Sequence, residues 1–283
     1  MQLVTSIPAW KQVRLGLGGA VGLVPTMGAL HAGHVALVRR CRAENDVTVV
    51  WIFVNPKQFG PSEDFARYPR DLARDMRLLE TEGVDYILSP TVEEVYPEAF
   101  QTTVNVEGLT RPLEGAVRPG HFQGVTTIVA KMFCLTQPRR AYFGQKDAQQ
   151  SLVVQRLVFD LGMLTEVVVC PTVREADGLA MSSRNVYLDA EERAFAPTLY
   201  RALQAAERAI AAGERDADAL RERMRREFSG RPGVSVDYVS IADVQTLQEL
   251  ATVDRPALLS LAVRVGRTRL IDNIPMTPPG AGR

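Results

Sequence analysis

The sequence predicts an α/β fold, a doubly wound parallel sheet joined to a second, smaller α+β C-terminal domain. Two observations support this prediction. Short apolar strands alternate with helical patterns through residues 1–173, as in a parallel sheet covered by helices on both faces. Beyond that point two helical patterns come first, and strands joined by a tight turn follow, as in an antiparallel α+β unit.

The elements of the first domain, 1–173, follow from apolar patterning. The clearest strand is 47–54, which is rich in β-branched residues and apolar almost throughout, as expected of a strand covered on both faces. Strands are predicted over 21–25, 47–54, 84–89, 102–106, 140–143 and 165–170, and helices over 34–44, 70–82, 122–135 and 147–161.

The second domain, 174–276, is predicted to begin with a long helix through residue 212. Asp189 and Glu192 have the spacing of a capping box at its start. Further elements are a helix over 216–228, a strand over 234–241, a short helix over 243–250, and strands over 257–265 and 268–274 joined by a hairpin turn at 266–267. The Pro- and Gly-rich segment 277–283 is predicted to be a disordered tail.

Composition excludes several classes of protein. The 283 residues are 46% hydrophobic and 23% charged, as in a soluble globular protein. Thirty-three basic residues balance 33 acidic ones, so no net field favours nucleic acid or an anionic membrane. No apolar run reaches the ~18 residues that a membrane span needs. We expect no signal peptide, and three widely spaced cysteines argue against a disulfide framework, so a cytoplasmic location is expected.

The segment 25–34, Pro-Thr-Met-Gly-Ala-Leu-His-Ala-Gly-His, carries the strongest functional signal. It lies between a predicted strand and a predicted helix and contains two of the three histidines. If Gly33 and His34 begin the helix, their free backbone N–H groups form a site for phosphate at the positive end of the helix dipole. His31 and His34 add donors that can become cations near neutral pH.

Two other interpretations of His31 and His34 stay open. Histidines at this spacing can share a metal ion, or they can be purely structural. A glycine-rich segment at 16–22 superficially resembles a dinucleotide fingerprint, but it precedes the first clear strand, and the Walker pattern is absent. Phosphate binding is favoured because a Gly-flanked strand-to-helix turn is the right physical setting for it.

Two further polar turns follow predicted strands. Lys146 opens a helix, where a cation opposes the helix dipole, so an anion is expected nearby. Gln58, Gln149 and Gln150 offer neutral amides that suit the hydroxyl groups of a small substrate. Because the carboxyl ends of parallel strands meet at one edge, we expect these turns to converge with 25–34 on one crevice.

The loop 174–185 contains Ser182, Ser183 and Arg184, a flexible cluster of phosphate donors. Its alternative interpretation is an ordinary interdomain linker. Its position before the second domain would allow it to close over a ligand. His121, in a turn that leads into a helix, is a further candidate whose role the sequence leaves open.

Four segments resemble the pantoate–β-alanine ligase family and occur in the family's order. They are 25–34, 53–59, 142–150 and 177–185. The His-x-Gly-His motif of the first is shared with the wider nucleotidyltransferase superfamily, whereas the four together are specific. The resemblance implies a Rossmann-like first domain that binds nucleotide and pantoate, and a second domain that closes over the site.

The resemblance also implies a two-step reaction in coenzyme A biosynthesis. The carboxylate of pantoate attacks the α-phosphorus of ATP, giving pantoyl adenylate and pyrophosphate; the amine of β-alanine then displaces AMP and gives pantothenate. Implied catalytic residues are His34 (the family's proton donor), His31, Lys146 and Arg184. Implied ATP-binding residues are Met27, Gly28, Ala29, Leu30, His31, Ala32, Gly33, His34, Gly144, Gln145, Lys146, Asp147, Val173, Met181, Ser182, Ser183 and Arg184. Gln58 and Gln150 are the implied pantoate residues, with Gln58 also near β-alanine.

Mg²⁺ and a homodimer are implied as well, although no side chain is identified as a metal ligand. Gln145 stands where many family members carry Glu. It keeps the hydrogen bonding but removes a charge, so acid–base chemistry is not expected of it. The strongest rival is another nucleotidylyltransferase on the same scaffold, which the glutamine segments disfavour. A non-catalytic nucleotide-binding protein is a second rival.

Overall fold

The first part of the chain folds around a six-stranded sheet in the order β1-β4-β3-β2-β5-β6, and every pair of neighbours is parallel. The computed structural model describes residues 1–61 and 63–279. The strands are β1 (Gln2–Val4), β2 (Val21–Thr26), β3 (Val47–Ile52), β4 (Tyr86–Leu88), β5 (Arg140–Gly144) and β6 (Glu166–Cys170). The predicted doubly wound parallel sheet is confirmed.

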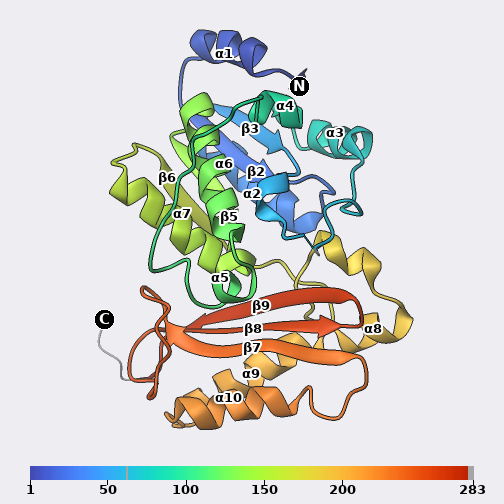
Figure 1. The fold of residues 1–283 in the computed structure, drawn as a ribbon, viewed down its shortest axis with the longest axis vertical. Coiled ribbons are helices and arrows are strands. Elements are labelled where there is room, and N and C mark those ends of the chain that lie inside the picture. Colours follow the sequence, from blue (N-terminus) through green and yellow to red (C-terminus); the bar gives the residue numbers. More distant parts are fainter. Residues whose placement is uncertain (62, 280–283) are drawn as a thin grey trace.

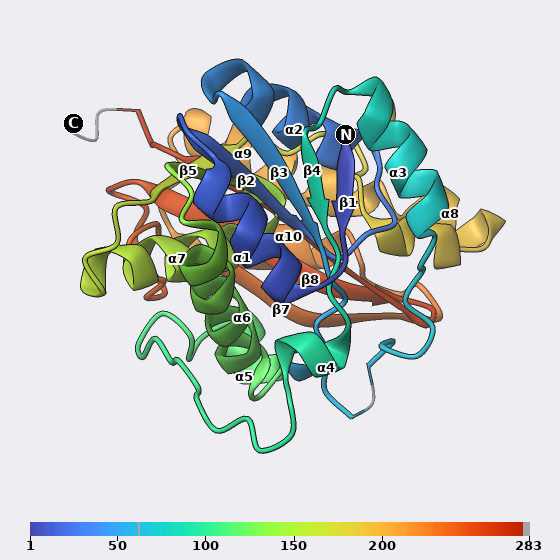
Figure 2. The same ribbon diagram turned by 90° about the horizontal axis from the view of Figure 1, so that it is seen from above.

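Helices cover both faces of this sheet (Figure 2). On one face, α1 (Ile7–Gly16), α6 (His121–Thr136) and α7 (Ala148–Asp160) share a core with Trp51. On the other face, α2 (Ala32–Glu44) and α3 (Leu72–Thr81) pack around Val50 and Ile87. Since β3 is buried along nearly its whole length, its apolar run is explained by cover on both sides. Short helices α4 (Val92–Val95) and α5 (Glu114–Val117) and the 3₁₀ turns η1 (Pro56–Gln58) and η2 (Gln145–Asp147) lie in the connections.

The winding of the sheet reverses between β2 and β5. From β2 the chain moves outward through β3 to β4, and from β5 it moves outward in the other direction to β6. A ligand of such a sheet binds outside the carboxyl ends of the strands at this reversal. The turns that follow β2, β3 and β5 therefore lie at one edge, as predicted.

The second part of the chain is a three-stranded antiparallel sheet, β7 (Val234–Asp243), β8 (Ala257–Val265) and β9 (Thr268–Met276). One face packs against α9 (Thr198–Ala211) and α10 (Ala217–Arg226), which share a core with it. The other face turns toward the first part (Figure 1), where Leu247 and Leu258 pack with Leu113 and Ala148. The predicted smaller α+β unit is confirmed, and we propose residue 173 as the boundary between the two domains.

Several predicted elements of the second domain are confirmed with altered bounds. Asp189 and Glu192 form the predicted capping box, but the helix is interrupted between α8 (Ala190–Phe195) and α9, where Pro197 has no N–H to donate. The 3₁₀ turn η3 (Ser183–Tyr187) precedes it. The two-residue hairpin is also confirmed, since Val265 pairs with Thr268.

Two predicted elements are wrong. The segment 102–106 is not a strand, because the N–H of Val104 donates to Thr127 Oγ1 (3.0 Å) and its C=O accepts from Thr126 Oγ1 (2.6 Å) on α6. The segment 243–250 is a turn, because the Asp243 carboxylate caps the N–H groups of the next residues. β1 and α1 were not predicted. Of the predicted tail 277–283, residues 280–283 lie outside the described residues.

Candidate active site

A cavity of about 230 Å³ lies at the carboxyl edge of the sheet, beside the reversal between β2 and β5. Residues from the three polar turns and from the loop before η3 line it together. The predicted site residues in its lining are Met27, His31, Gly33, His34, Gln58, Gly144, Lys146, Asp147, Gln150, Val173, Met181, Ser182, Ser183 and Arg184. A second cavity of about 460 Å³ between the domains shares Lys146, Ser182 and Arg184 with it. The three predicted turns therefore converge on one cavity, which adjoins a second cavity between the domains.

The turn after β2 is held in place by a side chain on α3. Gly28 has a φ of +80° and Ala29 one of +52°, a left-handed conformation that suits glycine and strains alanine. The buried Asp75 carboxylate on α3 accepts hydrogen bonds from the N–H groups of Ala29 (2.8 Å) and Leu30 (2.9 Å). These amides thus point at Asp75 rather than at a ligand. Gly28, Ala29, Leu30 and Ala32 lie outside the cavity lining, so their contact with ATP stays a prediction.

The two histidines cap their own helix. His31 is the N-cap of α2, and its Nδ1 accepts from the N–H of Gly33 (3.2 Å). The N–H of His31 points at Nδ1 of His34 (3.4 Å), and the N–H of His34 donates to the carbonyl of His31 (2.8 Å). The expectation of free N–H groups at Gly33 and His34 is therefore wrong, because the cap already uses both.

The imidazoles replace those amides as donors toward the cavity. Since Nδ1 of each ring accepts a hydrogen bond, the neutral ring carries its proton on Nε2. Burial, helped by Lys146, lowers the pKa of His31 to about 4, and burial, helped by His31, lowers the pKa of His34 to about 3. The expectation of titration near neutral pH is therefore wrong for these rings. They are neutral N–H donors at pH 7, a form that suits phosphate oxygens.

Lys146 is supported by the second domain. On β9, Asn273 Nδ2 donates to the carbonyls of Lys146 (2.8 Å) and Gln145 (3.0 Å), and its Oδ1 accepts from Gln145 Nε2 (2.9 Å). The ammonium group lies 3.4 Å from Asp147 Oδ1 in the cavity wall. Gln145 therefore docks the second domain onto the turn and does not line the cavity beside Lys146. Asn273 was not among the predicted site residues. The sequence offered one indication of it, the polar pair Asp272-Asn273 inside the predicted strand 268–274.

Gln58 is oriented by its neighbours at the cavity. Its Oε1 accepts from Asn55 Nδ2 (3.1 Å), and its Nε2 lies 2.8 Å from the sulfur of Met27. Gln150, in the first turn of α7, also lines the cavity. Gln149 does not, because it is buried and its amide bonds the carbonyls of residues 109 and 112 and the N–H of Glu114. The sequence interpretation of Gln149 as a substrate donor is thus wrong.

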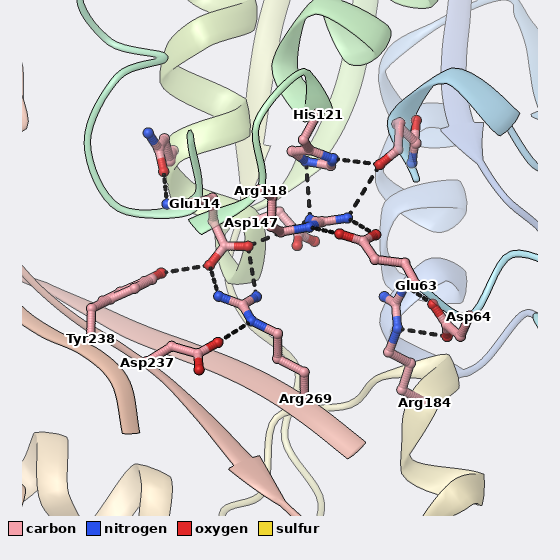
Figure 3. Close-up of polar contacts among 12 residues, drawn as sticks. Glu63, Asp64, Glu114, Arg118, His121, Asp147, Arg184, Asp237, Tyr238 and Arg269 are labelled. Carbon is pink, nitrogen blue, oxygen red and sulfur yellow. Dashed lines mark hydrogen bonds and ion pairs between the residues drawn. The ribbon is translucent and has the colours of Figure 1, made fainter. Parts of the chain in front are cut away.

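The start of η3 lies against the histidine turn. Ser183 Oγ donates to the carbonyl of Ala29 (3.1 Å). The Arg184 guanidinium forms a two-point ion pair with Asp64 (3.0 and 2.9 Å), shown in Figure 3. Although burial opposes ionisation, this guanidinium holds the pKa of Asp64 below its usual value. Sequence reasoning missed Asp64, because 120 positions separate it from Arg184.

Two other kinds of feature are absent from the part of the chain that the structure describes. Within residues 1–61 and 63–279, no group of three or more His, Cys, Asp or Glu side chains is arranged to hold a metal ion. In the same ranges no helix is long and apolar enough to cross a membrane.

Comparison with known proteins decides the family. Residues 2–275 match the family model described as pantoate–β-alanine ligase. The chain belongs to this family. It is 59% identical to the pantothenate synthetase of Roseiflexus sp. (strain RS-1), over 96% of this chain and 98% of that protein. It is also 59% identical to that of Herpetosiphon aurantiacus, over 98% of this chain and 100% of the relative.

Solved structures of the family agree with the fold. Pantothenate synthetase from Thermus thermophilus aligns with a TM-score of 0.94 at 51% identity, over 98% of this chain and 100% of that one. Pantoate–β-alanine ligase from Francisella tularensis, complexed with β-γ ATP and β-alanine, aligns with a TM-score of 0.81 at 33% identity, over 97% of each chain. This chain is accordingly a ligase on the α/β scaffold of that family.

Proposed function

We propose that this chain condenses (R)-pantoate with β-alanine to pantothenate, using ATP and a pantoyl-adenylate intermediate and releasing AMP and pyrophosphate. One observation carries the proposal. Neutral imidazole donors, a lysine and two glutamine amides line the same cavity at the reversal of the sheet. A carboxylate is unreactive toward amines, and adenylation gives it a good leaving group. The family supports the same conclusion.

In the first step the carboxylate of pantoate attacks the α-phosphorus, and negative charge spreads over the phosphoryl oxygens. Catalysis of such a transfer is mostly positioning and electrostatic stabilisation. We assign the donors to His31, His34 and Lys146, with Ser182–Arg184 closing on the phosphates from the other side. Because the ring of His34 is neutral, its Nε2–H serves as a hydrogen-bond donor to the phosphoryl group.

Pantoate is assigned to Gln58 and Gln150. Both amides border the cavity, and Gln58 also adjoins Met27 of the ATP-binding turn, so its ligand would meet the nucleotide at this point. In the second step the amine of β-alanine attacks the activated carbonyl, and AMP leaves. Gln58 is the residue next to which β-alanine would enter.

Mg²⁺ is proposed as the metal that accompanies ATP. The donor set fits a loosely held ion, since Mg²⁺ at nucleotides uses one or two carboxylates with phosphate oxygens and water. Asp147 contributes a half-exposed carboxylate to the cavity and is the candidate ligand. When bound, the ion would neutralise charge on the phosphates.

We also propose a cytoplasmic homodimer. Cys41, Cys134 and Cys170 are free thiols, as expected in a reducing compartment. Three exposed apolar side chains, Phe159, Leu161 and Leu164, lie at the end of α7 and just after it, beside the edge strand β6, so this surface is the candidate for contact with a second copy. Mass measurement in solution tests the dimer, and Leu164→Glu would weaken it.

A coupled assay with ATP, pantoate and β-alanine tests the reaction. We expect AMP as the product, and pantoate-dependent exchange of pyrophosphate into ATP without β-alanine. ADP as the product would overturn the mechanism. Pyrophosphate release with AMP retained on the product, even when β-alanine is present, would favour the rival nucleotidylyltransferase. Tight ATP binding with no exchange would favour a non-catalytic protein.

A further inference from the structure

The backbone carbonyl of Gln58 is held by two side chains, His121 at the start of α6 and Arg118 at the end of α5. His121 Nδ1 lies 2.8 Å from this oxygen and Arg118 Nη2 lies 3.3 Å from it. Both residues line the cavity, yet neither belongs to the segments that resemble the family's site. The question is whether they contact a ligand or act through Gln58.

The hydrogen bonds of both side chains are already used within the protein. His121 donates from Nδ1 to Gln58, while its Nε2 accepts from Arg118 Nη1 (3.2 Å). The other nitrogens of Arg118 donate to both oxygens of Glu63 at 2.7 Å (Figure 3). Burial, helped by Arg118, lowers the pKa of His121 to about 4, so the ring is neutral and can accept this bond. Because both side chains are already bonded within the protein, they are suited to holding Gln58 in place rather than to binding a ligand directly.

The turn that carries Gln58 is also seated against α6. A Cβ at Gly124 would lie 2.1 Å from the carbonyl oxygen of Lys57 and 2.7 Å from the nitrogen of Gln58, so only glycine allows this approach. The carbonyl of Gly124 accepts from Asn55, whose amide also bonds the side chain of Gln58. Backbone and side chain of Gln58 are thus fixed by the same helix start.

The second domain reaches this arrangement through Glu114. Arg269 on β9 donates to both oxygens of Glu114 at 2.8 Å, and Tyr238 donates at 2.9 Å. Arg118 completes the chain at 3.5 Å from Glu114, as Figure 3 shows. Two ion pairs and a hydrogen bond therefore connect Arg269 of the second domain to the carbonyl of Gln58.

We propose that Arg118 and His121 are positioning residues for Gln58 in pantoate binding, and that Arg269 acts on Gln58 through Glu114. This inference rests on the proposed function, because Gln58 is its pantoate residue. If Gln58 were held less firmly, pantoate would bind more weakly, while the ATP-binding turn would be unchanged. By analogy with the hydrogen-bond partners of metal ligands, whose loss typically costs about 10–100-fold, we expect an effect of about 10-fold here.

A pair of amide substitutions tests it. His121→Asn keeps a donor near the position of Nδ1, whereas His121→Gln moves it toward Nε2. In pantoate-dependent pyrophosphate exchange, we expect His121→Gln to raise the KM for pantoate about 10-fold with the KM for ATP unchanged, and His121→Asn to stay within about threefold of wild type. Arg269→Ala should shift the KM for pantoate in the same direction by a smaller factor, since it acts through two other residues.

Arg140→Ala is the control, because it removes an ion pair with Glu166 at the far end of β5 and should change neither KM. Equal rises in both KM values, or Asn and Gln variants with the same KM for pantoate, would overturn the inference. Absence of exchange in the wild-type protein would instead overturn the proposed function, so the two failures are distinguishable.

Discussion

The cavity has two walls, the turn after β2 and the wall formed by η2 with Ser182–Arg184, and they are held in place by different contacts. The wall after β2 is fixed mainly by bonds between backbone N–H groups and side chains of the same domain, with Asp75 holding the turn and His31 capping the helix. The opposite wall is attached across the domain boundary by side chains, such as the pair between Arg184 and Asp64 (3.0 and 2.9 Å) and the amide of Asn273. The first wall is therefore preformed, whereas the second depends on how the domains dock.

The walls also differ in charge. The donors of the first wall, His31 and His34, are neutral, because burial lowers the pKa of each. The cation of the second wall, Arg184, is already paired with Asp64. A phosphate would thus meet hydrogen-bond donors on one side and an ion pair that can be remodelled on the other. Changes to each wall should have distinct signatures.

The largest expected effect is that of His34→Ala on the first wall. Loss of one donor to a developing charge typically costs ~10²–10³-fold in rate, so pyrophosphate exchange should fall by that factor. Alanine is a good helix former, but the substitution removes the cap contact with the N–H of His31 (3.4 Å), worth about 1 kcal/mol, so the melting temperature should fall by only a few degrees. Exchange near the wild-type rate would show that the first wall does not supply this donor.

Asp75→Ala should loosen the turn after β2, although Asp75 itself does not line the cavity. It leaves the N–H groups of Ala29 and Leu30 unsatisfied, at a cost of about 2–4 kcal/mol in the free energy of unfolding. Urea denaturation measures this cost, and the KM for ATP should rise. The matched control is Asp71→Ala, the N-cap of the same helix, a lost cap worth about 1 kcal/mol with the KM for ATP unchanged. Equal effects of the two variants would contradict the assignment.

The sequence was sufficient for many residues that line the cavity and insufficient for the contacts that hold them in place. Strand-to-helix turns with Gly, His and Lys are local patterns, so the cavity residues at β2, β3 and β5 could be predicted from short segments. The contacts of Asp75, Asp64 and Asn273 could not be predicted, because their partners lie 46, 120 and 128 positions away. The free N–H groups and the titration of the histidines were also mispredicted, since both depend on contacts made only in the fold.

The pH dependence of stability should expose the neutral histidines. The folded-state pKa values of His31 and His34 lie below the ordinary 6.5, so between about pH 4 and 6.5 the unfolded chain binds more protons. Stability should therefore fall as pH is lowered through this window, with each ring contributing up to about 1.4 kcal/mol per pH unit. Urea denaturation between pH 7 and 4 measures the slope. In His34→Ala the slope of stability against pH should decrease by the contribution of up to one bound proton. An unchanged slope would contradict the lowered pKa of His34.

The smallest expected effect lies on the second wall, at Gln145. Gln145→Glu introduces the residue that many family members carry, but its carboxylate cannot donate to Asn273 Oδ1, which accepts from Gln145 at 2.9 Å. If Asn273 keeps its orientation, the carboxylate oxygen introduced at position 145 faces Asn273 Oδ1 and the two repel. If the amide of Asn273 rotates instead, its Nδ2 no longer donates to the carbonyl of Lys146. Loss of one neutral hydrogen bond is worth about 0.5–1.5 kcal/mol, so kcat/KM for ATP should fall about two- to tenfold at pH 8.

Protonation of the new carboxyl should restore the donor, so the deficit of Gln145→Glu relative to wild type should shrink as pH falls toward 5. The histidines stay neutral there, with pKa values of about 4 and 3, so wild type is a valid reference. Asn273→Ala, which removes all three bonds of the contact, should give a larger deficit that does not depend on pH. A Gln145→Glu deficit that is equally constant would mean that docking of the second wall does not depend on this amide pair.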